Sequence, residues 1–391
     1  MLDKLNKKFS KGYENFFKDN NQLANLLFYI AVLLLYIICI NNISKAISID
    51  SLIVIKLKVI TSTIFILKIL FNKENLFKYL LFLILISIAI ACDLCTGLSF
   101  DILFIVLLII ASRNIDSNKV IKMIICLNII TIGYHCAKYI IDYNLHPLVL
   151  KYQAQFIQNG IHSFYFCHPR IFVNILFSSW LMWFYLNFNN KEQIVKVYII
   201  GLLLAIITYI FTGFISTTIF YFIAMILYFV FQNKKLTNKE SIKIIVSLTF
   251  LLCFFLSWFS LITFGQDNII GEFISKINEL LNNRVLLGKR YLLEYGAGLF
   301  GKKFTLVDSI LASEFANTAL NNWYYYMIIR LGLLMSIFYC FIFCKSLLKL
   351  SENNNWSKVF VIVIFLLYSC IECVGVIPII SIPYFFIGMF L

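Results

Sequence analysis

The first apolar run of the chain, at residues 23–41, reads LANLLFYIAVLLLYIICIN and contains no charged side chain. A helix of about twenty such residues is long enough to cross the roughly 30 Å hydrocarbon layer of a bilayer. Similar runs recur along the 391 residues, of which 61% are hydrophobic and 13% charged, and the mean hydropathy is +0.90. We therefore expect an all-α polytopic membrane protein, since a soluble core of this size does not bury so much apolar surface and the alternating pattern of a β-barrel is absent.

The apolar runs predict about twelve transmembrane helices. They lie at residues 23–41, 51–71, 77–92, 99–112, 120–141, 169–187, 196–212, 214–232, 244–264, 322–344, 359–375 and 378–391. The second contains three lysines, Lys56, Lys58 and Lys68, and the last two are also compatible with one helix broken at Pro378 and Pro383. The expected organisation is a cytoplasmic tail at 1–22, spans one to nine at 23–264, an extracytoplasmic loop at 265–321 and spans ten to twelve at 322–391.

The net charge of +14 comes mainly from lysines and arginines in short segments between apolar runs. With the N-terminus in the cytoplasm, most of these residues fall on the cytoplasmic side, as the positive-inside rule requires, so we expect a bacterial cytoplasmic membrane protein and no nucleic-acid partner. The eleven cysteines lie mostly inside apolar runs, where they act as small hydrophobes. Two Cys-x-x-Cys pairs, at 92–95 and 370–373, have no nearby histidine, so no metal site is expected.

The long loop begins with apolar residues at helical spacing. These are Ile269, Ile270, Phe273, Ile274, Ile277, Leu280 and Leu281. Glu272, Lys276 and Glu279 form the opposite, polar side. The pattern predicts an amphipathic helix lying along the outer membrane surface.

A cluster of cations follows this helix, at Arg284, Lys289 and Arg290. Arginine suits phosphate because its planar fork donates two parallel, charge-assisted hydrogen bonds and keeps its proton. The cluster therefore predicts a phosphate partner near the membrane. Anchoring of the loop to anionic lipid head groups explains the charges equally well.

The sequence His168-Pro169-Arg170 stands at the outer mouth of the sixth span. Proline fits the first position of a helix, so His168 is expected at the cap. A helix N-terminus beside a histidine and an arginine can hold an oxyanion. The alternative is an interfacial histidine followed by an arginine that extends to the head groups.

Lys138, Arg330 and Glu372 are ionisable residues within apolar runs, where a charge needs a partner or an aqueous cavity. Arg330 follows the start of span ten by about two turns, and Glu372 is near the outer end of span eleven. The hypothesis from these positions is an Arg330–Glu372 ion pair.

The order of these features resembles the Wzy-type polymerases of O-antigen, capsule and exopolysaccharide assembly and the wider group that includes O-antigen ligases. The resemblance rests on His168-Pro169, where Arg170 replaces the Asn of the family, on Arg284 followed by Gly298-Leu299-Phe300-Gly301, and on Asn321-Asn322-Trp323-Tyr324 before a glycine. It implies a GT-C-like architecture, with no metal or other cofactor.

The resemblance also implies the reaction: an acceptor sugar hydroxyl attacks the anomeric carbon of a polyprenyl-diphosphate-linked oligosaccharide, and polyprenyl diphosphate leaves. Arginines stabilise the departing diphosphate, and His168 orients or deprotonates the acceptor hydroxyl. The catalytic candidates are His168, Arg284, Arg290, Glu294 and Asp308. The substrate-binding candidates are Arg170, Tyr291, Asn322, Tyr324, Tyr325, Arg330 and Glu372, with the tyrosines stacking on sugar faces. Partners are membrane lipid, a flippase and a chain-length regulator.

Two other functions remain open on the sequence. A flippase or transporter of lipid-linked oligosaccharides explains the many spans and buried charges, but it predicts two related halves, which are not visible. An O-antigen-type ligase shares the expected architecture and residues.

Overall fold

The computed structural model describes residues 21–44, 49–72, 74, 76–97, 101–145, 162, 164–166, 168–280, 283–303 and 322–391. The regular secondary structure of these residues is helical, apart from one isolated antiparallel bridge between Ser44 and Phe166. Among them, six helices are long and apolar enough to cross a membrane, or seven if α12 (Glu240–Ser247) and α13 (Thr249–Thr263) form one bent span. The chain is a multi-pass helical membrane protein.

The chain divides into two compact units. Unit 1 comprises residues 1–75, 108–234 and 377–389, and unit 2 comprises residues 76–107, 235–376 and 390–391. Unit 1 contains α2 (Asn21–Ile43), α3 (Ser51–Phe71), α6 (Ser117–Leu145), α8 (Pro169–Leu186), α9 (Lys191–Thr212), α10 (Ile215–Gln232) and α20 (Tyr384–Ile387). Unit 2 contains α4 (Leu76–Thr96), α12, α13, α14 (Ile269–Leu280), α15 (Arg284–Tyr295), α17 (Trp323–Tyr326), the π-helix η2 (Met327–Leu331), α18 (Leu333–Glu352), α19 (Trp356–Ser369) and the 3-10 helix η3 (Val374–Val376). Three helices cross the boundaries between these ranges: α5 (Asp101–Ala111), α11 (Lys234–Thr237) and η4 (Gly388–Phe390).

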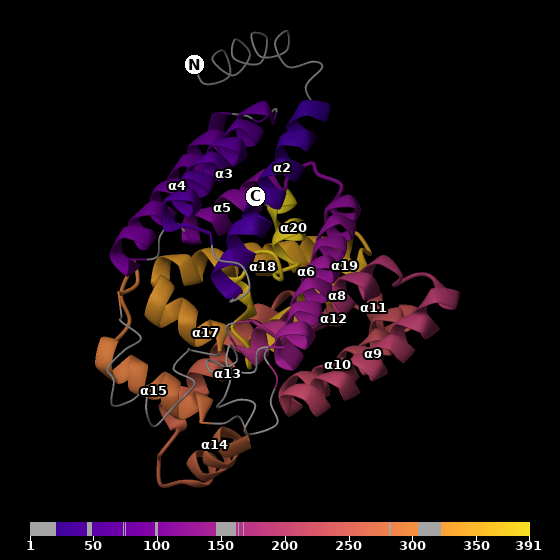
Figure 1. Cartoon of the computed structure of the whole chain (residues 1–391). Helices are drawn as coiled ribbons and strands as arrows, with labels where there is room; N and C mark the ends of the chain where they lie inside the picture. The colour runs from indigo at the N-terminus through magenta and orange to yellow at the C-terminus, as the bar shows by residue number, and fades with distance from the viewer. Residues whose placement is uncertain are drawn as a thin grey trace. The chain divides into compact units, whose positions relative to one another are not determined.

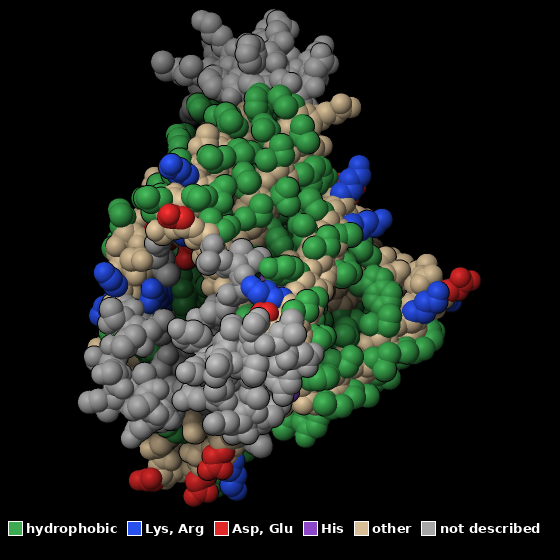
Figure 2. Space-filling model, in the orientation of Figure 1, with side chains coloured by type: hydrophobic (Ala, Val, Ile, Leu, Met, Phe, Trp, Pro, Cys, Tyr) green, Lys and Arg blue, Asp and Glu red, His purple; other side chains and the backbone are tan. Residues whose placement is uncertain are grey.

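The outer surfaces of several helices are apolar, as contact with hydrocarbon requires. On α9 and α10, Ile210 is 64% exposed and Phe229 is 65% exposed. Figure 2 shows hydrophobic side chains over these two helices and over the upper helices of the view. The opposite sides pack closely: a side chain at Gly201 would meet Met225 and Trp180 at 2.5 and 2.7 Å. The helices thus pair through small residues and turn branched and aromatic ones outward.

Polar side chains on one face of α6 form hydrogen bonds in the interior of unit 1. Asn128, Thr131 and His135 recur at intervals of three and four residues, so they lie on the same side of the helix. The Tyr36 hydroxyl donates to Asn128 Oδ1 and contacts Thr131 Oγ1, both at 2.9 Å. The Ser44 hydroxyl lies 2.6 Å from His135 Nε2. These bonds satisfy polar groups that are costly to bury alone.

Helix α13 is the centre of unit 2, and α14, α15, α17, α18 and α19 all contact it. In Figure 1, α13, α14 and α15 are drawn in neighbouring orange shades. A buried cluster joins α13, α14, α15, α17 and η2 through Leu261, Ile274, Val285, Tyr325 and Ile329. The two helices of the long loop are therefore part of the core of unit 2.

Up to residue 369 the predicted spans coincide in position with helices, but among the described residues only six helices, or seven with the bent α12–α13 pair, have the length and composition of a span, against the twelve predicted. The ninth predicted span bends by 49° between α12 and α13, and the tenth is broken at Gly332. Helix α5 has 11 residues, too few to cross a bilayer at 1.5 Å per residue. The predicted helix at 378–391 is wrong, because Pro378 and Pro383 leave only the four-residue α20 and a short 3-10 turn.

Helix α14 forms as predicted and keeps an exposed apolar side. Ile269 is 86% exposed and Phe273 is 60% exposed, while Ile274 is buried against α13 and α15. Glu272 and Lys276 are exposed on the neighbouring sector. An apolar strip beside charged side chains is typical of a helix at a membrane interface.

Replacing Phe273 with tryptophan tests this position. We expect brominated lipids to quench the added fluorescence beyond that of the five native tryptophans, because residue 273 would lie among acyl chains. Glu279→Trp, exposed and about 120° around the same helix from Phe273, is the control and should be quenched much less. Equal quenching of both variants would contradict an interfacial orientation.

Candidate functional site

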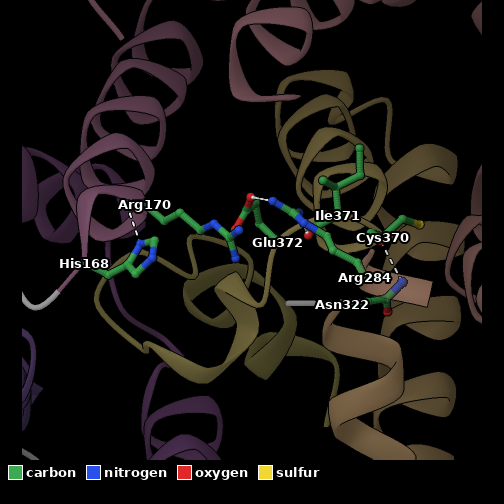
Figure 3. Close-up of polar contacts among 7 residues, drawn as sticks. All are labelled: His168, Arg170, Arg284, Asn322, Cys370, Ile371 and Glu372. Carbon is green, nitrogen blue, oxygen red and sulfur yellow. Dashed lines mark hydrogen bonds and ion pairs between the residues drawn. The ribbon is translucent and has the colours of Figure 1, made fainter. Parts of the chain in front are cut away.

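The loop and the membrane helices of unit 2 meet at residues 370–372, directly after α19. Arg284 donates from Nη1 to the Ile371 carbonyl and from Nη2 to Glu372 Oε1 at 2.8 Å. Asn322 donates from Nδ2 to the Cys370 carbonyl at 2.6 Å. Figure 3 shows these side chains converging on the end of α19. Two distant parts of the chain therefore bind consecutive carbonyls of one segment.

The start of α15 directs Arg284 to this segment. Asn283 adopts a left-handed conformation, with φ of 61°, and ends the connection from α14. Asn278 of α14 is buried, and its Oδ1 accepts hydrogen bonds from the Val285 and Leu286 amides at 2.9 and 3.0 Å. These amides belong to the first turn of α15, which lacks partners within its own helix. Asn278 thus fixes the helix that carries Arg284.

The ion pair between Arg284 and Glu372 is deeply buried. The side chains are 5% and 3% exposed. Arg284 also meets the negative end of the α19 dipole, since its partner Ile371 lies just past the last turn of that helix. Its Nε atom is buried and makes no hydrogen bond. The guanidinium therefore has one donor that the described protein atoms leave unused.

Glu372 has a different partner from the one that its sequence position predicted. The predicted pair joined it to Arg330, whereas the structure joins it to Arg284. Arg330 lies in η2, and Gly301 packs so closely on it that a Cβ there would stand 1.9 Å from the Arg330 carbonyl oxygen. The Leu333 and Leu334 amides, at the start of α18, donate to the carbonyls of Gly298 and Leu299. The Gly298–Gly301 segment thus packs on the break at Gly332, between η2 and α18.

Arg284 and Arg290 do not point to the same place. They are six residues apart in α15, which is about 240° around the helix axis. Arg284 is buried, whereas Arg290 and Glu294 are exposed on another side. One diphosphate cannot be held between the two arginines within this helix, as the joint assignment requires. Asp308 lies outside the described residues.

The tyrosines have mostly structural surroundings. Tyr324 and Tyr325 are 0% and 3% exposed, and their hydroxyls bond the Leu366 carbonyl and Ser260 Oγ. Both rings are buried and leave no exposed face on which a sugar could stack, contrary to the sequence hypothesis. Tyr291 is half-buried, and burial raises its pKa, with Glu294 adding to the rise and Arg330 opposing it. Its hydroxyl therefore stays protonated at neutral pH.

Asn322 is a helix cap rather than an exposed binding residue. It is 4% exposed, and its Oδ1 accepts from the amides of Tyr324 and Tyr325 at 2.8 and 3.2 Å. Its Nδ2 also donates to Ser257 of α13 at 3.1 Å. Asn322 thereby ties α17 to both α13 and the segment after α19.

His168 and Arg170 lie in unit 1, at the start of α8. As predicted, His168 is the cap and Pro169 the first helical residue; His168 Nδ1 accepts from the Arg170 amide at 3.1 Å. Arg170 is 8% exposed, and its guanidinium lies over the Phe214 ring at 5.3 Å from the centroid. Because His168 Nδ1 accepts this hydrogen bond, the proton of the neutral ring lies on Nε2.

An aromatic cluster precedes this cap. Tyr139 contacts His162 Nδ1 at 2.7 Å, and Tyr165 donates to Asp142. Burial raises the pKa of Tyr165 to about 12, and Asp142 adds to the rise, so the hydroxyl remains a donor. Phe164 and Tyr165 both have positive φ, at 48° and 63°, which is a strained conformation for aromatic residues. Nothing in the spacing of these residues indicated the cluster.

No group of three or more His, Cys, Asp or Glu side chains that could hold a metal lies within the part of the chain that the structure describes. Cys92, Cys95, Cys370 and Cys373 are free thiols.

Comparisons with known proteins gave no relative. No protein-family model matches the chain, and searches of curated proteins and of solved structures returned no match.

Proposed function

We propose that this protein is a glycosyltransferase that joins polyprenyl-diphosphate-linked oligosaccharide repeats at the outer face of a bacterial cytoplasmic membrane. The multi-pass helical fold supports a lipid-linked substrate. The observation that carries the proposal is the arginine of the long loop, held by α14 and α15 against a carboxylate at the end of a membrane helix. A cation for the leaving diphosphate and a carboxylate for the acceptor are thus in one place.

The chemistry follows from the charges. When the bond from the anomeric carbon to the diphosphate breaks, negative charge grows on the bridging oxygen. Arg284 would stabilise that charge more in the transition state than in the ground state, which is the requirement for acceleration. The buried Nε–H has no hydrogen-bond partner, so it could donate to a phosphate oxygen that reaches it without loss of an existing hydrogen bond.

The other predicted residues take supporting roles in this proposal. Arg290 lies on the exposed side of α15 and would contact lipid head groups or the glycan. Tyr291 of α15 and Arg330, which is near enough to lower the pKa of Tyr291, would contact the substrate together. Asn322 would position the segment that carries Glu372. His168 and Arg170 belong to unit 1, and acceptor binding by these two residues is a separate proposal that rests on the sequence. The protein partners that we propose for this activity in the cell are a flippase and a chain-length regulator.

A reconstituted assay tests the function. Purified protein in vesicles, supplied with chemically defined lipid-linked repeats, should produce glycans of two or more repeats. It should release one polyprenyl diphosphate for each new glycosidic bond. Movement of intact repeats across the bilayer without new bonds would instead indicate a flippase. Transfer only to a different lipid acceptor would indicate a ligase.

A further inference from the structure

We propose that Glu372 is the general base of this transfer and that Arg284 masks it until a diphosphate is bound. The inference rests on the proposed function and deepens it by assigning the proton acceptor. It comes from the geometry of the resting pair, in which Arg284 Nη2 and Glu372 Oε1 are 2.8 Å apart and both side chains are at least nine-tenths buried.

The first step is a competition of anions for one guanidinium. A diphosphate carries more charge than a carboxylate and accepts bidentate hydrogen bonds from arginine. Arg284 offers it the unpartnered Nε and, by turning from Glu372, the Nη2 group. The bond from Nη1 to the Ile371 carbonyl can persist during this exchange, because it uses a different nitrogen.

The second step follows from burial. Glu372 is 3% exposed, so when Arg284 turns away its carboxylate is a buried charge without a cation, and transfer of a proton to it removes that charge. The acceptor hydroxyl supplies that proton as its oxygen forms the bond to the anomeric carbon. The bond from that carbon to the diphosphate breaks, its electron pair stays on the diphosphate oxygen, and Arg284 neutralises the new charge. Glu372 later returns the proton to water and pairs with Arg284 again.

The two roles predict opposite effects on binding and turnover in one variant. Full-length Glu372→Gln in detergent should bind the probe geranylgeranyl diphosphate about tenfold more tightly than wild type, because the competing carboxylate is gone. Its transfer of lipid-linked repeats should fall at least about hundredfold, the loss expected for a general base. Arg284→Met should bind the probe more weakly. Glu279→Gln, which removes an exposed carboxylate on α14, is the control and should change neither.

A chemical readout on the wild-type protein covers the case in which Glu372→Gln does not fold. A hydrophobic carbodiimide attacks protonated buried carboxyl groups, so labelling of Glu372, measured by peptide mass spectrometry, should rise when the probe is added. Labelling of Glu279 serves as the internal reference. Unchanged labelling of Glu372, or Glu372→Gln that is folded but binds the probe no more tightly, would overturn the masking. Failure of the wild-type protein to bind the probe at all would instead refute the proposed function.

Discussion

Arg284→Ala is expected to destabilise the protein by about 3–5 kcal/mol, the largest effect of any single change described for the site. The reason is that the variant leaves Glu372 as a buried charge with no cation and also leaves the Ile371 carbonyl without its donor. The measurement is thermal unfolding in detergent, followed by tryptophan fluorescence and by the fraction of monodisperse protein at each temperature.

A double variant shows how much of the destabilisation comes from the unpaired charge and how much from the lost side-chain contacts. Arg284→Met with Glu372→Gln removes both charges at once, and replacing a buried pair with neutral groups is often close to neutral for stability. We expect this protein to unfold within about 1 kcal/mol of wild type. If the Arg284→Ala variant were as stable as the wild-type protein, the pair would not be buried in solution as it is in the structure.

The second large effect is expected for Gly332→Ala, at the break between η2 and α18. Gly332 has a φ of 90°, and a Cβ there would stand 2.1 Å from the Gly301 nitrogen and 2.6 Å from the Leu299 oxygen. Backbone strain of about 1–3 kcal/mol and overpacking of about 1–3 kcal/mol should combine. The same unfolding measurement should show a loss of about 3 kcal/mol or more.

Gly213→Ala is the matched control for that substitution. Gly213 ends α9 with a φ of 66°, but no atom lies within 4 Å of the Cβ that alanine would add. Only the left-handed conformation opposes the change, so the expected loss is about 1 kcal/mol. Equal losses at the two glycines would mean that the Gly298–Gly301 turn does not pack on the helix break.

Hydropathy alone predicted where most helices lie, because in a bilayer the apolar length of a segment decides whether it can span. Hydropathy did not predict the helix breaks and ends that depend on tertiary contacts. The break at Gly332 depends on a turn some thirty residues earlier in the chain, which no local pattern contains. At the C-terminal side, Pro378 and Pro383 outweighed the apolar composition of residues 378–391, since proline removes a helix donor.

The site was predicted in part, by residue type more than by geometry. Arg284, Asn322 and Glu372 were all singled out from the sequence, and the structure brings them to one segment. Pairing Arg284 with Arg290 ignored helical periodicity, which separates them around α15. Asn278 was missed, although it carried a signal: it is a polar residue in phase with the buried Ile274 of α14. Such a residue usually caps or bonds something in the core.

The ion pair of unit 2 has a consequence for biogenesis. Its two members are 88 residues apart, so a ribosome completes α15 well before it adds Glu372. Until then the Arg284 guanidinium has neither its carboxylate nor the carbonyl of Ile371. A nascent chain that stalls before α19 therefore carries an arginine that lacks its carboxylate. The last helices of the chain are needed to balance a charge that the loop introduces much earlier.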